Sequence, residues 1–472
     1  MLFTSMEFLI IFFPLVLAVY FLLFEKARNY WLLIASLFFY AWGEPKFVLA
    51  MVASITINYL LAMRIEELAG KTIHRKLMLA LAVVLNIGLL FVVKYMNFVT
   101  GNLQILFPES VTVTNFVLPI GISFFTFQAL SYVIDVYRGI PAQKNICYLG
   151  LYISLFPQLI AGPIVRYTTV MDEIDHREIT VDSFSKGMYR FMLGFNKKVL
   201  LANLLAAVAD AAFSATQLST AMAWLGAICY SLQIFFDFCG YSEMAIGLGL
   251  MFGFRFLENF DYPYISKSVT EFWRRWHISL GTWFRDYVYF PLGGSRVESK
   301  VRLVFNLAVV WLATGIWHGA NWTFILWGVL HGFVIVLEKL FSIPARVEKK
   351  AWSRWVYRVF TLLVVVMGWV LFRAADLSQG MNYIKTMFAL TGTAAADTAF
   401  WFNLREYFVI IVMGMVCSTP VIRNIKERLS AKTTRAQLVC DGIGSAVQVI
   451  LFFVSVSFLI MNAHNPFIYF NF

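Results

Sequence analysis

Residues 271–294 read EFWRRWHISLGTWFRDYVYFPLGG, and after an apolar span residues 313–321 read ATGIWHGAN. These segments place His277, His318 and several charged side chains in a chain that is otherwise mostly hydrocarbon. Polar groups at membrane depth are costly, so such a cluster indicates function. Basic residues alternate with tryptophan, tyrosine and phenylalanine in the first segment, which predicts an interfacial or partly inserted helix beside a cavity.

The composition around this cluster is that of an integral membrane protein. Of 472 residues, 60% are hydrophobic and 14% are charged, whereas a soluble domain has about 25% charged residues. Apolar runs of roughly 17–25 residues, long enough for a helix to cross a bilayer, recur along the chain. We therefore expect an all-α polytopic membrane protein, organised as a single domain over residues 1–472.

Two of the apolar segments carry proline and glycine in mid-span, at residues 118–121 and at residues 156–163. Both are predicted to be broken or re-entrant elements, because freed backbone groups need protein or water partners. About eleven true crossings are expected. The candidate spans are Met6–Phe24, Tyr30–Trp42, Lys46–Met63, Leu77–Val93, Phe116–Val136, Cys147–Val165, Gly187–Phe213, Met222–Phe252, Val301–Trp317, Trp322–Leu340, Trp355–Phe372, Tyr407–Val421 and Ile443–Met461.

The chain has a net charge of +11, and the distribution of its basic residues along the sequence predicts its membrane topology. Basic residues gather in short segments predicted to be loops, which the positive-inside rule assigns to the cytoplasm, and they form no stripe that would favour nucleic-acid binding. With Arg423–Arg435 inside, the last span carries the tail, residues 462–472, to the extracytoplasmic side. The five scattered cysteines show no metal-ligand spacing, so neither a disulfide framework nor a metal site is expected.

Two histidines are candidates for catalysis. A neutral imidazole at His318, flanked by small residues, can act as a general base that deprotonates a hydroxyl for attack on an activated acyl group. A core histidine bonded to a neighbouring helix fits the same pattern. For His277 the functional reading is a second polar group that orients the acyl carbonyl or the base, and the alternative is a solvated interfacial histidine.

Other polar residues could line a substrate path. Asp237 and Tyr241 share one helix face at a spacing of four residues, and they could line a tunnel or hold helices together. Gln128 in the first broken element and Asn321, three residues after His318, are further candidates. Two more candidates are Arg274 and Arg275, which could attract an anionic donor or simply anchor an interfacial helix.

Five motifs, in their order along the chain, resemble those of the membrane-bound O-acyltransferase family, and of its alginate and peptidoglycan O-acetyltransferase branch in particular. They are Leu118–Gln128, Phe156–Ile164, Glu271–Leu280, Trp283–Asp286 and Gly315–Gly319. The resemblance implies a helical bundle around a central funnel that leads to His318 as the essential histidine, with His277 as the second site histidine. It also implies an acetyl donor that is a cytoplasmic thioester, with acetyl-CoA expected and no bound cofactor.

The chain ends PFIYFNF, an aromatic tail that could be an interfacial anchor. It also resembles a C-terminal motif of envelope-acylating systems, in which the tyrosine is an acyl relay; Tyr469 would then accept the acyl group while His318 takes its proton. The expected protein is an acetyltransferase of a bacterial cytoplasmic membrane that acts with an extracytoplasmic SGNH-hydrolase-like partner to acetylate a polysaccharide. A D-alanyl transferase supplied by a carrier protein and a polysaccharide or lipid transporter are the alternatives.

Overall fold

The computed structural model describes residues 1–431, 433–461 and 468. All regular structure in these residues is helical, which confirms the all-helical fold class. The chain packs as two compact units, Met1–Phe191 with Met244–Leu257 and Met192–Glu243 with Glu258–Phe472. The single-domain description of the chain stays a prediction.

The first unit holds the N-terminal helices of the chain. They are η1 (Glu7–Phe12), α1 (Phe13–Leu22), α2 (Glu25–Gly43), α3 (Phe47–Glu67), α4 (Thr72–Leu90), η2 (Phe91–Tyr95), α5 (Met96–Leu106), α6 (Ile122–Tyr137), α7 (Ile146–Ser154), α8 (Phe156–Leu159) and α9 (Tyr167–Asp175). Buried amides join α3 to α4, where Asn58 and Asn86 donate to each other at 3.1 and 2.8 Å. Such interhelical bonds replace the hydrophobic driving force that is missing in lipid.

Both predicted breaks are present in this unit. The helix α6 begins only at Ile122, after Gly121 adopts a left-handed φ of 76°, so the span that the sequence places at Phe116–Val136 is helical only in its second part. A Cβ on Gly121 would lie 2.8 Å from the carbonyl oxygen of Leu159, in the second broken element. That element is divided into α7 and α8, with a proline at the start of α8. The two breaks therefore meet, and the contact requires glycine.

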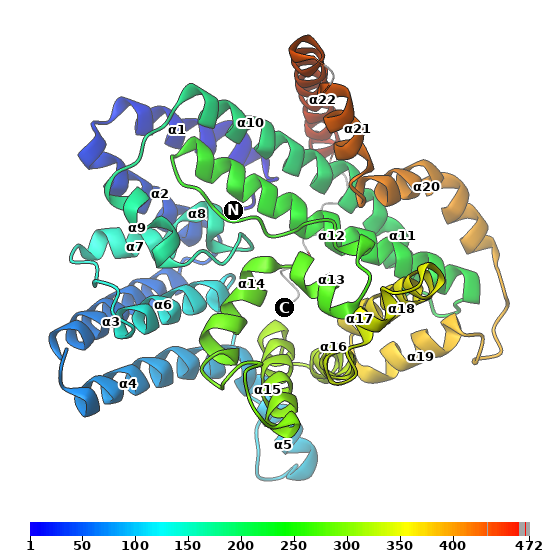
Figure 1. Ribbon diagram of the computed structural model, residues 1–472, viewed down its shortest axis with the longest axis horizontal. Coiled ribbons are helices and arrows are strands. Elements are labelled where there is room, and N and C mark those ends of the chain that lie inside the picture. The colour runs from blue at the N-terminus through cyan, green and yellow to red at the C-terminus, as the bar shows by residue number, and fades with distance from the viewer. Residues whose placement is uncertain (432, 462–467, 469–472) are drawn as a thin grey trace. The chain divides into compact units, whose positions relative to one another are not determined.

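The second unit holds the candidate site (Figure 1). The division between the units falls within α10 (Val181–Asn196) and α12 (Thr220–Met251). The remaining elements are η3 (Lys197–Ala202), α11 (Asn203–Phe213), η4 (Pro263–Ile265), α13 (Val269–Arg275), α14 (Ile278–Phe284), η5 (Arg285–Tyr289), α15 (Lys300–His318), α16 (Trp322–Leu340), α17 (Ile343–Val347), α18 (Ala351–Arg373), α19 (Leu377–Met387), α20 (Thr398–Cys417), α21 (Val421–Ser430) and α22 (Thr434–Ile460).

A π-helical turn, η3, interrupts the long helix that runs from Val181 to Phe213. π-Helical turns are rare and are frequently found at functional sites. This one carries Lys197 and Lys198, and the Nζ atom of Lys198 lies 2.6 Å from the Asp237 carboxylate on α12. Both side chains of this ion pair are 2% exposed, so the turn introduces a compensated charge pair into an apolar span.

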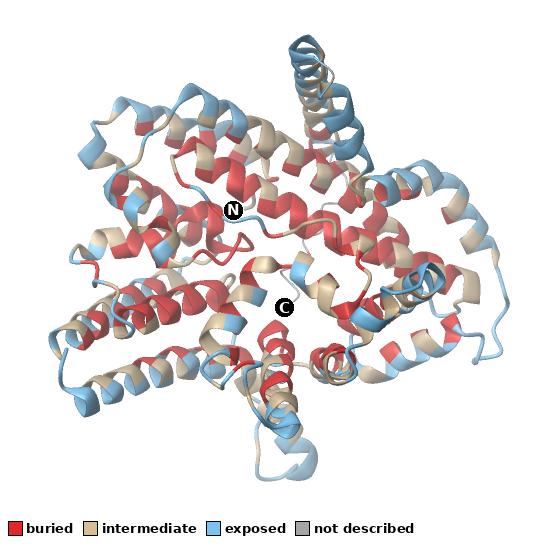
Figure 2. Ribbon diagram, in the orientation of Figure 1, coloured by how far each residue is buried: buried red, intermediate tan, exposed pale blue. Residues whose placement is uncertain are grey.

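Nine helices among the described residues are long and apolar enough to cross a membrane, and Glu7–Leu22 and Ile122–Tyr137 are shorter apolar helices. The predicted number of about eleven crossings stays a prediction. Burial differs strongly between the spans: 89% of the most apolar window of α12 is buried, but only 6% of that of α22 (Figure 2). Apolar surface of the kind that α22 exposes is compatible with contact to lipid.

Two details of the predicted topology need correction. The basic segment Glu25–Arg28 is the first turn of α2 rather than a loop, where the acidic Glu25 is favourable beside the positive end of the helix dipole. The basic segment Arg423–Arg435 is likewise mostly helical, because α21 and the start of α22 occupy it. The sides of the membrane on which these segments lie stay predictions.

Candidate active site

His318 is the last residue of α15, and its position depends on close packing of α15 against α16. Glycines allow the two helices to approach: a Cβ on Gly315 would lie 2.7 Å from the carbonyl oxygen of Phe324, and one on Gly328 would lie 2.6 Å from that of Trp311. The helix ends at Gly319, where the ring of Phe324 occupies the space of a side chain. His318 is thereby held at a helix end against the aromatic face of α16.

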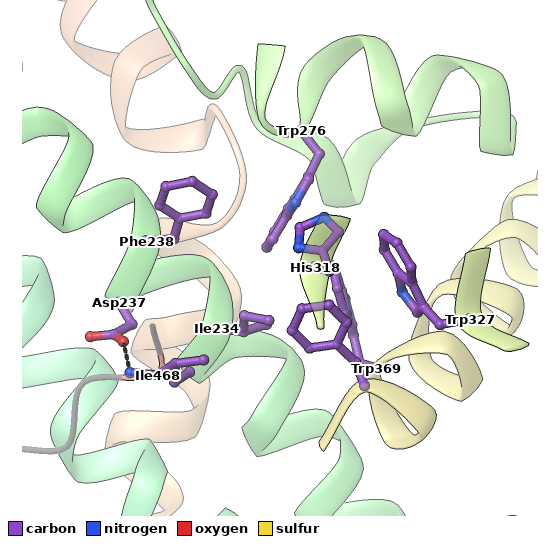
Figure 3. Close-up of a pocket in the computed structure, with 9 residues that line it drawn as sticks. Ile234, Asp237, Phe238, Trp276, His318, Trp327, Trp369 and Ile468 are labelled. Atoms are coloured by element: carbon purple, nitrogen blue, oxygen red, sulfur yellow. Dashed lines mark hydrogen bonds between the residues drawn. The ribbon is translucent and has the colours of Figure 1, made fainter. Parts of the chain in front are cut away.

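Aromatic side chains surround the imidazole of His318, which is 7% exposed. Its ring centroid lies 4.9 Å from that of Trp327 and 5.3 Å from that of Phe372, and Trp276 faces it across the pocket (Figure 3). The free space for water-sized spheres is about 10 Å³, which is room for roughly one water molecule. The walls of this pocket, the His318 pocket, are Ile234, Phe238, Trp276, Trp327, Trp369 and Phe372.

The His318 pocket also contains a charged residue and one residue of the C-terminal tail. Asp237, which the sequence suggests as a path-lining residue, and Ile468 both line it. The backbone N–H of Ile468 donates a hydrogen bond to Oδ2 of Asp237 at 2.9 Å (Figure 3). Tyr469, the predicted relay, follows Ile468 directly in the chain and lies outside the described residues.

His277 stands between two short helices in an unusual backbone conformation. The sequence predicts one interfacial helix here, but α13 ends at Arg275 and α14 begins at Ile278. Between them His277 has a φ of 46°, in the left-handed region. The helix breaks because its backbone bonds to a neighbouring loop instead: Asp261 N–H donates to the carbonyl of Arg275, and Ile278 N–H donates to that of Asn259.

Asn259 fixes the protonation pattern of His277. Its Oδ1 accepts hydrogen bonds from the backbone N–H and the hydroxyl of Ser279, at 3.2 and 2.9 Å. The backbone N–H can only donate, so this atom must be the amide oxygen. His277 Nδ1 lies 3.2 Å from the same oxygen and must carry the proton of the neutral ring. Nε2 then presents a lone pair, and no described residue hydrogen-bonds to it.

Burial keeps this imidazole neutral. His277 is 2% exposed and lies outside the nine spans. Removing the charged form from water lowers its pKa to about 3. At neutral pH His277 is therefore an uncharged ring whose Nε2 can accept a proton or a hydrogen bond.

His277 lines a second and much larger cavity of about 640 Å³, the His277 cavity. Three cations, Arg274, Arg285 and Lys339, line it together with aromatic and aliphatic side chains. Among the described residues, Trp276 is the one that lines both this cavity and the His318 pocket. The expected helix beside a cavity is thus a set of short helices around a cavity with a cationic lining.

The other candidate residues have varied surroundings. Arg274 is exposed in the His277 cavity, whereas Arg275 bonds to Asp261 and Glu271 at 2.8 and 3.0 Å. Asn321 caps α16 by accepting from Thr323 N–H, and it donates to the carbonyl of Ala375. Tyr241 is buried one helical turn after Asp237, and Gln128 is buried on α6 in the first unit.

Two residues of this site were missed by sequence reasoning. Asn259 lies in an irregular segment eighteen positions before His277 and belongs to no periodic pattern, so nothing in the sequence singles it out. Lys198 gives a usable signal, because two adjacent lysines inside an apolar span call for buried partners. The nearby carboxylates of α12 were the natural candidates for those partners.

Comparison with known proteins agrees with this architecture. Residues 61–377 match the membrane-bound O-acyltransferase family. A probable alginate O-acetylase of Pseudomonas putida is 40% identical over 100% of both chains, and one of Azotobacter vinelandii is 45% identical over 84% of this chain and 80% of its own. A peptidoglycan O-acetyltransferase of Helicobacter pylori is 34% identical over 84% of this chain and 81% of its own.

The family match covers more than half of the chain, and the Pseudomonas relative aligns from end to end. The helices with membrane-spanning length and the buried polar site agree with that match. The chain is a multi-pass membrane protein and an acyltransferase, and it belongs to the membrane-bound O-acyltransferase family.

Proposed function

We propose that this protein moves an acetyl group from a cytoplasmic thioester across the membrane for O-acetylation of a cell-envelope polysaccharide. In this proposal His318 is the general base and Tyr469 is the acyl relay. One observation carries the assignment: His318 and Ile468 line the same buried pocket, and Tyr469 is joined to Ile468 by one peptide bond. The names of the relatives, which act on alginate and peptidoglycan, support a polymer of the envelope as the acceptor.

The proposed step conserves atoms and charge. The phenol oxygen of Tyr469 attacks the thioester carbonyl while His318 accepts the phenol proton, because a phenol with a pKa of about 10 needs a base at neutral pH. The carbon–sulfur bond breaks, and the thiolate leaves and takes up a proton. The resulting aryl ester then passes its acetyl group to a hydroxyl of the next acceptor, which restores the tyrosine.

The His277 cavity is the proposed site of the donor. Its volume of about 640 Å³ and its three cations suit a thioester that carries phosphate groups, which favours acetyl-CoA. His277 Nε2 can accept a hydrogen bond from an N–H or O–H group of the bound donor and so help to hold it in this cavity. The His318 pocket has room for roughly one water molecule, which favours a small acyl group such as acetyl over a bulkier one.

Delivery to the polymer completes the proposal. The positive-inside rule supports a C-terminus outside a bacterial cytoplasmic membrane, and in this proposal the acetyl group leaves on the extracytoplasmic side. We expect a separate SGNH-hydrolase-like protein to take it there and to acetylate the polysaccharide. The bilayer is the other partner, and no nucleic acid takes part.

The test is a mass measurement on purified protein after incubation with isotopically labelled acetyl-CoA. We expect the label on the C-terminal peptide of the parent, none in His318→Ala or Tyr469→Phe, and parental labelling in His74→Ala, which alters an exposed histidine. Labelling of Tyr469→Phe would exclude the relay. Labelling by a D-alanyl carrier thioester instead of acetyl-CoA would replace the donor. A parent that neither donor labels, although polymer acetylation in cells is normal, would refute the tyrosine relay.

A further inference from the structure

The buried carboxylate of Asp237 contacts the tail through the peptide backbone. Its Oδ2 accepts the N–H of Ile468 at 2.9 Å, and the Ile468 side chain is 6% exposed in the His318 pocket. A backbone N–H bonded to a carboxylate is a strong, charge-assisted hydrogen bond. The hydrogen bond is made by the backbone of Ile468, so it does not depend on the chemistry of a tail side chain.

Lys198 compensates the charge of the Asp237 carboxylate, so that this hydrogen-bond acceptor can be buried in an apolar span. Its Nζ lies 2.6 Å from Asp237 Oδ1 and donates to Asn203 Oδ1 at 2.8 Å. The ammonium thus compensates the carboxylate from one side and leaves Oδ2 for the tail. A buried ion pair is by itself weak evidence for a contribution to stability. Binding of a ligand by Oδ2 of Asp237 would explain why the pair is buried here.

The same long helix also holds the last membrane helix. Asn196, two residues before Lys198, accepts the Ser455 hydroxyl at 2.9 Å and donates to the carbonyl oxygen and the side chain of Gln448 on α22. Contacts with Asn196 therefore hold α22 before the chain leaves it after Ile460, and the hydrogen bond to Asp237 holds the chain again at Ile468. Both fixed points lie beside the π-helical turn.

We propose that the Asp237–Lys198 pair is a binding site for the backbone of the C-terminal segment, and that it sets the register in which Tyr469 meets His318. The effect on catalysis rests on the proposed function, whereas the docking of the segment does not depend on it. One residue of slippage would shift each Cα atom to the position of its neighbour, about 3.8 Å away. Misplacement of a reacting group by about 1 Å can lower the rate a hundredfold, so a contact that fixes the register of the segment would matter for catalysis.

The first experiment measures docking without acyl transfer. The substitution Ile468→Cys places a thiol at the docked position, and its alkylation rate is read from the mass of the peptide released by cleavage after Met461, which contains none of the five native cysteines. The parent background is compared with two neutral pairs, Asp237→Asn with Lys198→Met and Asp237→Leu with Lys198→Met. Both remove the buried charges, and only the asparagine keeps an oxygen that accepts an N–H.

We expect slow alkylation in the parent background and in the asparagine pair, and alkylation at least tenfold faster in the leucine pair. Equal rates in the two neutral pairs would overturn the docking site, because the acceptor would then make no difference. Each protein is checked for a single symmetric peak in gel filtration, so a misfolded variant is recognised.

The second experiment leaves the Asp237–Lys198 pair untouched. Ile468→Pro and Ile468→Ala both remove the isoleucine side chain, but only proline also removes the N–H. With labelled acetyl-CoA we expect Ile468→Pro to lose at least tenfold more tail labelling than Ile468→Ala, with no change in the KM for the donor. Equal losses would refute the backbone contact. If the parent takes up no label, but protection of the thiol in Ile468→Cys depends on the acceptor at position 237, the tyrosine relay is refuted and the docking site stands.

Discussion

Replacing His277 by asparagine removes a titrating group while keeping its local structure. Asparagine tolerates the left-handed conformation better than other residues with a side chain, and the φ of His277 is 46°. Its amide can also donate to Asn259 in place of Nδ1, which lies 3.2 Å from Oδ1. The variant therefore differs from the parent mainly in lacking Nε2 and the ability to gain a proton.

The magnitude follows from the pKa of His277. Burial lowers it to about 3 in the folded protein, whereas an unfolded histidine titrates near 6.5. Because the folded pKa is depressed, the stabilisation is complete above pH 6.5 and is lost progressively as the pH falls toward 3. Between pH 7.5 and pH 5.0 this histidine takes up a proton in the unfolded chain but stays neutral in the folded chain, which lowers the free energy of unfolding by about 2 kcal/mol.

The assay is equilibrium unfolding in mixed micelles at pH 7.5 and pH 5.0. We expect the parent to lose about 2 kcal/mol more than His277→Asn between the two pH values. His74→Asn, which alters an exposed histidine, should retain the parental pH dependence. If His277→Asn loses as much stability as the parent, His277 is not a buried neutral imidazole and the assignment of its free Nε2 fails.

Three further changes test other parts of the site. Asn259→Asp should raise the pKa of the imidazole that it contacts by roughly 2, read by NMR of labelled histidine, since a carboxylate favours the charged ring; an unchanged pKa would contradict the contact. Gly328→Ala should cost about 2 kcal/mol of unfolding free energy because its Cβ would lie 2.6 Å from a carbonyl oxygen, whereas Gly442→Ala, with nothing within 4 Å, should not destabilise the protein. Arg274→Ala should raise the KM for acetyl-CoA about tenfold, or about 1.4 kcal/mol, and a much smaller rise would remove Arg274 from the donor site.

The sequence predicts the helical class and both broken elements, because apolar run length and mid-span proline are local signals. The break at Gly121 is an example: its glycine is visible in the sequence, and the structure adds the contact with Leu159 that requires it. The grouping of His318 and His277 at one site stays a prediction, because His318 lines the His318 pocket and His277 lines the neighbouring His277 cavity.

Non-local contacts could not be predicted. The single interfacial helix expected at residues 271–294 is broken at His277 because its backbone bonds to Asn259 and Asp261, which lie in another segment. The two adjacent arginines look alike in sequence, but Arg275 is held by Asp261 and Glu271 while Arg274 faces the cavity. The roles of Tyr469 and of the candidate path residues stay predictions.

Trp276 separates two spaces that the proposed reaction must connect. It is 3% exposed, and its indole lines both the His277 cavity and the His318 pocket. A membrane protein that hands an activated group from one compartment to another also has to remain tight to ions, or it would dissipate the gradients that the cell maintains. In the proposed reaction, a bulky ring between a wide cavity and a pocket with room for about one water molecule would act as such a barrier to ions, and it would have to move for each acyl transfer.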